Sequence, residues 1–528
     1  MIKIVPFCLA LLFITNLTKA QVSIYRHTNT QFNHVDRYLY RSENRYHTSV
    51  KPYIYQQVDT IINIDSLYAF QFDKPIWKHL FNTSLIDFRK SKNFTFTIDP
   101  LFDFQIGKSR EFANKSSINM RGLLATATIN KKFSITTSFC ENQVFFNDYR
   151  DSLVQTLRTI PGQGRFKKFK ETGYDYGFAE GYLSYNPNNV FNIQFGTGKH
   201  FFGDGYRSLI LSDNSFSYPF LKITTDIWKI KYVNLWAQFQ DSNVADPNST
   251  GYNKKWGAFH YLDWTVTKWF TFSFFEAVIW PSNDTTVGYR GFDFYYANPV
   301  VFYRPVEFNR GSPDNSLMGL NLKFTFFKNY VFYAQFMFDE FKLNEILNRT
   351  GWWANKYAIQ GGFKTFDLLK IKHLDIQTEV NFVRPFTYSH KNGLYNYGNL
   401  NQPLAHPLGA NFIESISFLK YSYKRFFVEA RFSYAIHGSD TANSNFGNDI
   451  YKTYATRTKD YGNTIGQHNK IKVALGSIML SYLVNPATNM NVFFQYVIRK
   501  ENSALYTKNE GLFMLGFRTA LNNFYYDF

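Results

Sequence analysis

Apolar and polar side chains alternate along most of the chain after residue 92. In the first such stretch, Phe94, Phe96 and Ile98 are separated by polar residues. Successive side chains of a β-strand point to opposite faces, so this period of two predicts strands with one apolar and one polar face. About eighteen segments of this kind can be marked along the sequence. In chain order they cover residues 93–106, 117–130, 132–146, 173–186, 190–199, 218–228, 230–241, 255–267, 269–280, 315–327, 329–340, 355–366, 370–383, 411–423, 425–437, 469–484, 490–500 and 511–522.

The connections between these segments alternate between short and long. Several short connections consist of a single lysine, such as Lys131, Lys229 and Lys424. The long connections include roughly 25 residues after position 146, 34 after position 280, 27 after position 383 and 31 after position 437. Outer-membrane barrels combine short periplasmic turns with long outer loops. The pattern therefore predicts an all-β fold, a transmembrane antiparallel β-barrel of about 18 strands.

An even number of strands places both ends of the barrel domain on one side, so both termini are predicted to be periplasmic. Closing the ring pairs the segment 511–522 with the segment 93–106 and leaves no free edge. The chain ends in FYYDF, and a terminal aromatic strand that ends in Phe resembles the signal for the barrel-insertion machinery. That machinery and outer-membrane lipid are therefore expected partners.

The first 92 residues differ from the rest. Residues 1–20 combine a charged start, an apolar core and a small-x-small cleavage site, which is typical of a secretory signal peptide. Residues 21–92 lack alternation, and Val35 and Leu39 are spaced as on one face of a helix. Two further short helices are allowed at 65–72 and 76–88. We predict a small, partly helical periplasmic region at 21–92, either a plug or partner-docking element or a structural lead-in, before a barrel at 93–528.

The composition narrows the possible partners. Aromatic residues make up 20% of the chain, yet the mean hydropathy is −0.31, as alternation produces when one face meets lipid and the other the lumen. The formal net charge of +18 suits anionic lipid, acidic polysaccharide or nucleic acid, and export makes nucleic acid an unsuitable partner. Without the signal segment only Cys140 remains, so neither an internal disulfide nor a cysteine metal site is predicted.

A loop bent by glycines follows the predicted strand 190–199. Its GTGK sequence at 196–199 looks like part of a phosphate-binding loop. That loop needs a glycine where Ile193 stands and a Ser or Thr where His200 stands. Nucleotide binding is therefore not predicted.

Several loop motifs together resemble a known family. They are TIPGQGR (159–165), GYDYGF (173–178), GKHFFGDGYRSL (198–209), LSDN (211–214), YPFLK (218–222), NPVVF (298–302), RPVE (304–307) and QPLAHPLGAN (402–411). They resemble the Wzi-type capsule-assembly family, in the Bacteroidota branch that includes the gliding-motility protein RemB. The resemblance covers nearly the whole mature chain. It implies an outer-membrane barrel of about eighteen strands, lectin-like binding of surface polysaccharide in capsule assembly, and a link to gliding-motility or surface-assembly proteins.

Three long connections carry side chains suited to a saccharide, which needs planar hydrogen-bonding groups, aromatic faces and, for an acidic polymer, Arg or Lys. The candidate polysaccharide-binding residues are Lys199, His200, Asp204, Tyr206, Arg207, Arg290, Asn298, Tyr303, Arg304, Glu307, Asn309, Arg310, Tyr388, His390, Tyr395, Tyr397 and His406. One interpretation is a shared, outward-facing saccharide site. The other is that Arg304 with Glu307, and Asp204 with Arg207, form ion pairs that brace loops folded into the lumen.

Enzymatic functions have weaker support. Asp204 and Glu307 supply two carboxylates, but nothing in the sequence fixes their separation for glycoside hydrolysis. No Gly-x-Ser-x-Gly elbow is present, and His200 and His406 lack the spacing of metal ligands. We predict no catalytic residue, metal or cofactor. The predicted function is surface polysaccharide binding for capsule or exopolysaccharide attachment; the alternatives are a channel or translocation barrel for solute or polymer, and a motility or surface-assembly scaffold.

Overall fold

The computed structural model describes residues 35–41, 43–62, 67–91, 93–109, 115–245, 251–284, 288–441, 443–519 and 522–528. The predicted signal peptide at 1–20 lies outside these residues. Within the described part of the chain, no helix has the length and apolar character needed to cross a membrane.

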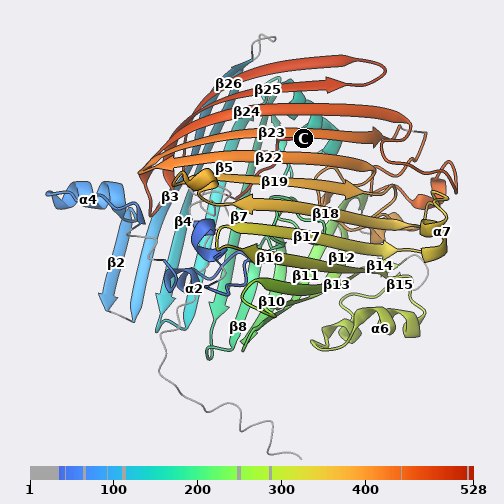
Figure 1. Ribbon diagram of the computed structural model, residues 1–528, viewed down its shortest axis with the longest axis horizontal. Coiled ribbons are helices and arrows are strands. Elements are labelled where there is room, and N and C mark those ends of the chain that lie inside the picture. Colours follow the sequence, from blue (N-terminus) through green and yellow to red (C-terminus); the bar gives the residue numbers. More distant parts are fainter. Residues whose placement is uncertain are drawn as a thin grey trace, which may run out of the picture.

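Eighteen long strands form a closed antiparallel ring (Figure 1). They are β3 (Phe94–Ser109), β4 (Lys115–Ile129), β5 (Phe133–Phe145), β7 (Gly173–Tyr185), β8 (Phe191–Gly198), β10 (Tyr218–Ile227), β11 (Ile230–Ala245), β12 (Tyr252–Trp264), β13 (Phe270–Pro281), β16 (Asn315–Phe326), β17 (Tyr330–Glu340), β18 (Lys356–Thr365), β19 (Leu374–Val383), β22 (Phe412–Tyr423), β23 (Phe426–Ser439), β24 (Asn469–Asn485), β25 (Met490–Asn502) and β26 (Thr507–Arg518). The predicted all-β barrel is confirmed, and each of its strands overlaps one predicted segment.

Shorter elements lie in the N-terminal part and in the connections. They are β1 (Val50–Lys51), α2 (Tyr55–Asp59), α4 (Pro75–Asn82), β2 (Ile86–Ser91), α5 (Asp148–Leu157), β6 (Lys167–Phe169), β9 (Phe201–Phe202), β14 (Asn283–Asp284), β15 (Gly288–Tyr289), η2 (Phe294–Ala297), α6 (Tyr303–Arg310), α7 (Leu343–Leu347), η3 (Leu368–Lys370), η4 (Gly393–Tyr395), β20 (Gly398–Asn399), β21 (Gln402–Pro403) and η5 (Tyr454–Thr456). We call the end of the barrel that carries the long connections the long-loop end, and the opposite end the short-turn end.

The alternation along each strand explains why the sheet closes into a ring. In β5, Ser134, Thr136 and Ser138 are buried, whereas Ile135 and Phe139 between and beside them are 39% and 52% exposed. A strand with this pattern has one face for the lumen and one for lipid. The ring closes between β26 and β3, with Leu512 opposite Ser109, as the sequence predicted.

The first described residues, from Val35 on, lie inside the barrel, and the chain then leaves it. Val35, Leu39, Tyr53 and Val58 form a small apolar cluster, and β1 pairs with β9 of an inward-folded connection. Residues 35–62 therefore fill part of the lumen. The predicted helix face of Val35 and Leu39 is observed, since residues 35–39 are helical and both side chains are buried.

The short helix that the sequence allowed at 76–88 is observed as α4 (Pro75–Asn82), but residues 86–88 at its end are extended instead. Residues 86–91 form β2, which pairs with the first part of β3, with Phe88 opposite Phe96. The physical reason is an unpaired edge: β26 ends at Arg518, opposite Asp103 of β3, so the earlier residues of β3 need another partner. In Figure 1, α4 and β2 stand at the side of the barrel.

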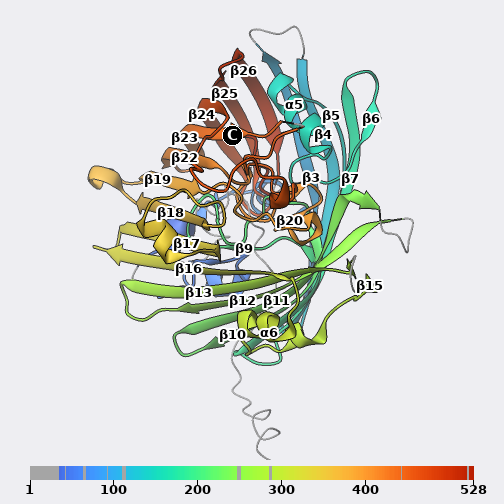
Figure 2. The same cartoon turned by 90° about the vertical axis from the view of Figure 1, so that its right-hand side faces the viewer.

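The end of the chain also differs from the expectation. The sequence predicted a last strand as far as residue 522 and a periplasmic C terminus, whereas residues 522–528 turn into the lumen. Figure 2 shows the C terminus within the ring of strands. Tyr525 and Asn523 donate hydrogen bonds to the carboxylate of Asp213 at 2.7 and 2.8 Å. These buried polar contacts explain why residues 522–528 fold into the lumen instead of continuing β26.

Candidate functional site

The connection after β8 enters the lumen instead of facing outward. It carries five of the predicted binding residues, which are Lys199, His200, Asp204, Tyr206 and Arg207. Lys199 Nζ donates to the carbonyl oxygens of Gly162 at 2.7 Å and Asp213 at 3.3 Å. Asp204 is fully buried and accepts a hydrogen bond from Thr48 Oγ1 at 2.6 Å. The expectation of an outward-facing site is thus wrong for this loop, whose polar groups are used in packing the lumen.

Arg207 is the centre of a buried ionic cluster. Its guanidinium lies 3.0 Å from the carboxylate of Glu414 and 2.9 Å from that of Asp527. Asp527 also binds Arg431 at 2.8 Å. Burial alone would raise the pKa of Asp527, but Arg207 and Arg431 hold that pKa below its ordinary value. The expected pair between Asp204 and Arg207 is replaced by these partners, which tie the C-terminal segment to the loop.

The connection after β19 packs into the same interior. Tyr388 is fully buried, and its hydroxyl donates to the carbonyl of Leu209 at 2.7 Å. His406 is also fully buried, with Nε2 lying 2.7 Å from the Glu414 carboxylate. Burial lowers the pKa of His406, although Glu414 acts in the opposite direction. These residues brace the loop and offer no surface to a polymer, while His390 is half-buried at the edge of the same loop.

The connection after β13 lies elsewhere. It carries the remaining predicted residues, which are Arg290, Asn298, Tyr303, Arg304, Glu307, Asn309 and Arg310. The hydroxyl of Tyr303 lies 2.7 Å from Nε2 of His260 on β12, so the connection is folded against the wall. Arg304 and Glu307 form an ion pair at 2.9 Å, as the second interpretation predicted. The connection is not folded into the lumen, however, which that interpretation also expected. Because this connection is apart from the other two, the single shared site is not formed.

An open cavity at the long-loop end is the best candidate for binding a large ligand. Its volume is about 1120 Å³, and we call it the long-loop cavity. It lies between α5, the connections after β19 and β23, and the long-loop ends of strands β23 to β26. Phe528 is among its lining residues. In Figure 2, α5 and the C terminus lie close to the β24–β26 side of the ring, where this cavity is found. The residues named as candidates from the sequence do not line it.

The lining of the long-loop cavity combines aromatic rings with hydrogen-bonding groups. The aromatic residues include Tyr149, Tyr451 and Tyr506. Two buried nitrogens in its wall, Nδ1 of His437 and Nε of Arg499, have no hydrogen-bond partner among the described residues. A buried polar atom without a partner is costly, so both nitrogens favour a ligand or water that supplies one.

The lining charges are mixed in sign. The acidic residues are Asp148, Asp151, Asp440, Asp449, Glu501 and Glu510, and the basic residues are Arg158, Lys452, Arg499 and Lys508. Some of these charges neutralise each other, since Arg499 lies 2.6 Å from Glu501. The hydroxyl of Tyr506 donates to the same carboxylate at 2.5 Å. The cavity is therefore not a strongly basic site, despite the overall positive charge of the chain.

Sequence reasoning missed this cavity for a physical reason. Its walls come from α5, from Asp440 and residues 448–452, and from the C-terminal residue. These parts meet only when the barrel closes and the last segment turns inward. The available signal was the length of the connections after residues 146 and 437. The candidate binding residues were selected because Arg, His and Tyr suit a saccharide. In this barrel, the selected residues of the connections after β8 and β19 mostly fill the lumen.

Comparisons with known proteins define the fold. No protein-family model matches the chain, and no curated protein matches its sequence. Among solved structures, the chain is similar to Wzi of Escherichia coli, an outer membrane protein involved in group 1 capsule assembly and described as a carbohydrate-binding β-barrel. The identity is 12% and the TM-score 0.52, over 95% of this chain and 100% of that one.

Two porin structures give lower scores. OccAB2 of Acinetobacter baumannii is 10% identical with a TM-score of 0.43, over 80% of this chain and 97% of its own. A BenF-like porin of Pseudomonas fluorescens is 8% identical with a TM-score of 0.42, over 80% of this chain and 99% of its own. By its closed ring and its likeness to Wzi, the chain has the fold of an outer-membrane β-barrel.

Proposed function

We propose that the protein binds polysaccharide at the cell surface through the long-loop cavity. The observation that carries the proposal is an open cavity of about 1120 Å³ whose wall holds tyrosine rings and two buried nitrogens without partners. Sugar rings present hydroxyl groups for such nitrogens and apolar faces for such rings. The fold likeness to a carbohydrate-binding barrel supports the same function.

The cavity favours a neutral or mixed-charge glycan. Acidic side chains are more numerous than basic ones in its lining, so a strongly acidic polymer would meet like charge there. The net charge of +18 belongs to the chain as a whole and does not describe this cavity. Attraction between exposed charges weakens as salt is added, whereas binding by hydrogen bonds and ring contacts is less sensitive to salt.

The proposal includes an orientation. The long-loop end faces the outside of the cell, and the short-turn end faces the periplasm, as in outer-membrane barrels generally. A role in capsule assembly or in gliding motility, with protein partners at the surface, would use the same outward-facing cavity. The resemblance in the sequence motifs supports these roles, and the outer membrane is the proposed location.

The test compares cavity variants with a control outside the cavity. Purified protein is titrated with polysaccharide from the surface of the cells that make it, at low and at high salt. Tyr506→Ala and Lys508→Ala, both in the lining, should each raise Kd about fivefold, since a lost contact of ~1 kcal/mol corresponds to that factor. Arg304→Ala, half-exposed on the outer wall, should leave Kd unchanged. Equal binding by all variants would refute the site, and absence of binding would refute the function.

A further inference from the structure

The connection between β13 and β16 packs on the outside of the barrel, and we call residues 288–314 the outer-wall segment. The direction of the wall side chains shows this. Phe259, Tyr261, Phe275 and Ala277 belong to the apolar core inside the ring. Alternate residues on the same strands therefore point outward. Those residues include Ala258, Val278 and Trp280, which pack with Tyr296 and Tyr303 of the segment.

Beneath the segment lies a polar pair on the outward face. His260 and Glu276 stand opposite each other on β12 and β13, and Nδ1 of the histidine lies 2.8 Å from the carboxylate. Glu276 is midway along β13, at the height where a barrel meets hydrocarbon. An ionisable group exposed to lipid at this depth is costly, yet both residues are only 3% exposed.

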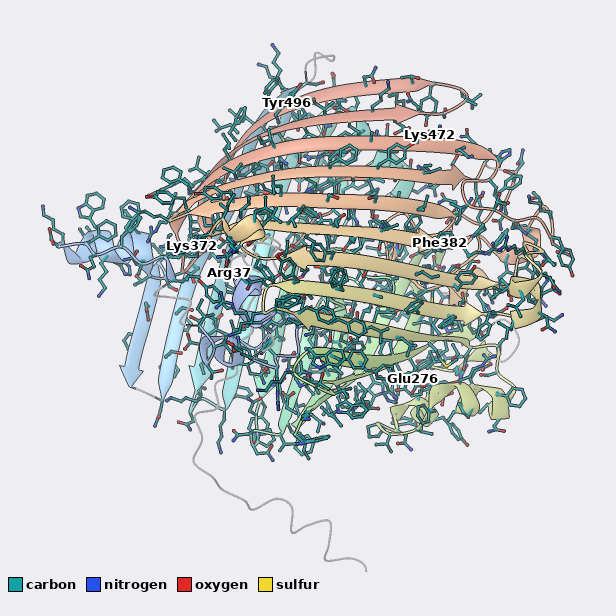
Figure 3. The ribbon with its side chains drawn as sticks, in the orientation of Figure 1. Arg37, Glu276, Lys372, Phe382, Lys472 and Tyr496 are labelled. Atoms are coloured by element: carbon teal, nitrogen blue, oxygen red, sulfur yellow. The ribbon has the colours of Figure 1, made fainter. Side chains whose placement is uncertain are left out.

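The outer-wall segment supplies the cover for this pair. The backbone N–H of Tyr303 donates to Glu276 at 3.0 Å, and its hydroxyl lies 2.7 Å from Nε2 of His260. The rings of Tyr303 and His260 stack with centroids 4.1 Å apart. Figure 3 labels Glu276 on the wall beside the helix α6. The segment thus satisfies polar groups that lipid would leave without partners.

Two residues of the neighbouring strand β11 also hydrogen-bond to the backbone of the segment. Tyr232 donates to the carbonyl of Pro299 at 2.7 Å, and Trp236 Nε1 donates to the carbonyl of Tyr296 at 2.8 Å. Together with the contacts of Tyr303, these bonds fix the segment along the strands rather than over the barrel mouth. Its position is therefore at the height of the apolar band.

The segment exposes several large apolar side chains, alongside the exposed polar residues Asn298, Arg304, Asn309 and Arg310. Phe294, Val300, Phe302 and Phe308 are 83%, 79%, 61% and 76% exposed. The charged residues of the segment mostly pair within it. Arg290, for example, binds the carboxylates of Asp293 and Asp314, and Arg310 binds Asp293. Exposed apolar side chains beside internally neutralised charges suit a hydrocarbon environment rather than water.

These apolar side chains continue the lipid-facing band of the barrel. Phe302 packs edge-on against Phe274 of β13, with ring centroids 6.0 Å apart. Other strands present exposed apolar side chains outward, such as Phe195 on β8 and Phe332 on β17, at 63% and 47% exposure. An apolar band of this kind around a barrel is contacted by the acyl chains of bilayer lipids.

We propose that the outer-wall segment is immersed in the membrane and binds lipid acyl chains through Phe294, Val300, Phe302 and Phe308. It acts as a lateral lipid-contact surface, and its inner face keeps the His260–Glu276 pair out of the hydrocarbon. The surface is separate from the long-loop cavity, so its failure would leave the proposed function untouched.

Spin labels test the proposal on the full chain. Phe302→Cys and Phe308→Cys are made in a Cys140→Ala background, labelled with a nitroxide and reconstituted in vesicles of phosphatidylcholine and phosphatidylglycerol. Power saturation then measures collision with oxygen, which concentrates in hydrocarbon, and with a water-soluble nickel chelate. Phe195→Cys is the control in the lipid-facing band, and Tyr461→Cys, in an exposed connection at the long-loop end, is the control in water.

The expected result is an oxygen-to-nickel accessibility ratio at both segment positions that matches Phe195→Cys and exceeds Tyr461→Cys several-fold. A ratio like that of Tyr461→Cys would place the segment in water and overturn the proposal. Low accessibility to both reagents would also overturn it, because a protein surface, such as a second copy of the chain, would then cover the segment. Heat-modifiable migration on a gel verifies that each labelled protein is folded, and agreement between the two positions excludes an effect of one substitution.

Discussion

At the scale of single residues, burial lowers the pKa values of three histidines in the inward-folded connections. Burial lowers the pKa of His200 far below its ordinary value, and it also lowers the pKa of His406. His390 is closer to the surface, and burial, with Lys356 nearby, lowers its pKa to about 4. All three are therefore neutral at pH 7 when the loops are in place, and protonation opposes their burial.

His390 predicts a pH dependence of the connection 384–411. Between the lowered pKa of about 4 and the ordinary value near 6.5, the opened loop binds a proton that the closed loop does not. Acidification through this range therefore weakens closure, whereas the stabilising contribution is fully present above the ordinary pKa. Hydrogen exchange of residues 384–411, corrected for the intrinsic effect of pH, should be faster at pH 5 than at pH 7.5.

The matched variant for this prediction is His390→Gln, which stays neutral at both pH values. It should lose the part of the pH dependence that His390 contributes, with His406 of the same connection keeping its own part, and it should show similar exchange at pH 7.5. Equal protection of the native loop at pH 5 and pH 7.5 would show that protonation of His390 does not act on closure.

At the scale of elements, the strands were predictable and the interior was not. A wall strand such as β5, with Ser134 inward and Phe139 outward, has one face for lipid and one for the lumen, so its alternation is forced. β12 and β13 depart from this pattern where the outer-wall segment covers them. A loop that fills a lumen has no such constraint. Arg207 or His406 would look the same in sequence whether it held a sugar or, as observed, the carboxylate of Glu414.

Strand β2 shows the same limit on a smaller scale. Its residues 86–91 are few, and a short segment shows too little periodicity to distinguish a strand from a helix. What makes it a strand is tertiary: the first part of β3 lacks β26 as a neighbour. The last residues of the chain were misassigned for a related reason, because their aromatic pattern suits a strand while Asp527 finds its partners inside.

Phe88→Pro should expose the early part of β3. Proline has no backbone N–H for the ladder, so pairing between β2 and β3 is weakened at Phe96. Hydrogen exchange at residues 94–98 should become several-fold faster, while residues 512–518 of β26 stay unchanged. The matched control is Phe88→Ala, which keeps the backbone donor and should behave like the native chain. Unchanged exchange at 94–98 in the proline variant would contradict the role of β2 as an edge partner.

At the scale of the whole molecule, a ring of this width needs its interior filled or it becomes a channel. Residues 35–62, the connections after β8 and β19, and residues 522–528 all enter the lumen. The apolar core inside the ring joins wall residues such as Phe259 and Phe275 to loop residues such as Leu209 and Tyr388. The molecule is thus a largely filled barrel. The long-loop cavity lies at one end, and a smaller cavity of about 180 Å³ remains between β3–β5, β23–β26 and the C-terminal segment.

Filling predicts electrical behaviour. In planar bilayers the native protein should show no steady conductance, because the lumen is packed by these segments. Replacing residues 387–409 with a short Gly-Ser linker removes the part of the plug that contains Tyr388 and His406, and should produce stable conductance steps. The control replaces residues 453–461, around η5 in the connection after β23, with the same linker. This variant should show no steady conductance. Steady conductance of the native protein would instead favour the channel alternative.

The outer-wall segment also has a consequence for how the protein sits among its neighbours. A plain barrel is nearly round in the plane of a membrane, so all sides are equivalent to whatever lies next to it. Here one sector of the circumference, over β12 and β13, carries an extra layer of protein that includes α6 (Figure 1). Crowded copies cannot approach one another closely on that side, so the sector biases their in-plane orientation and leaves the opposite strands as the faces available for close lateral packing.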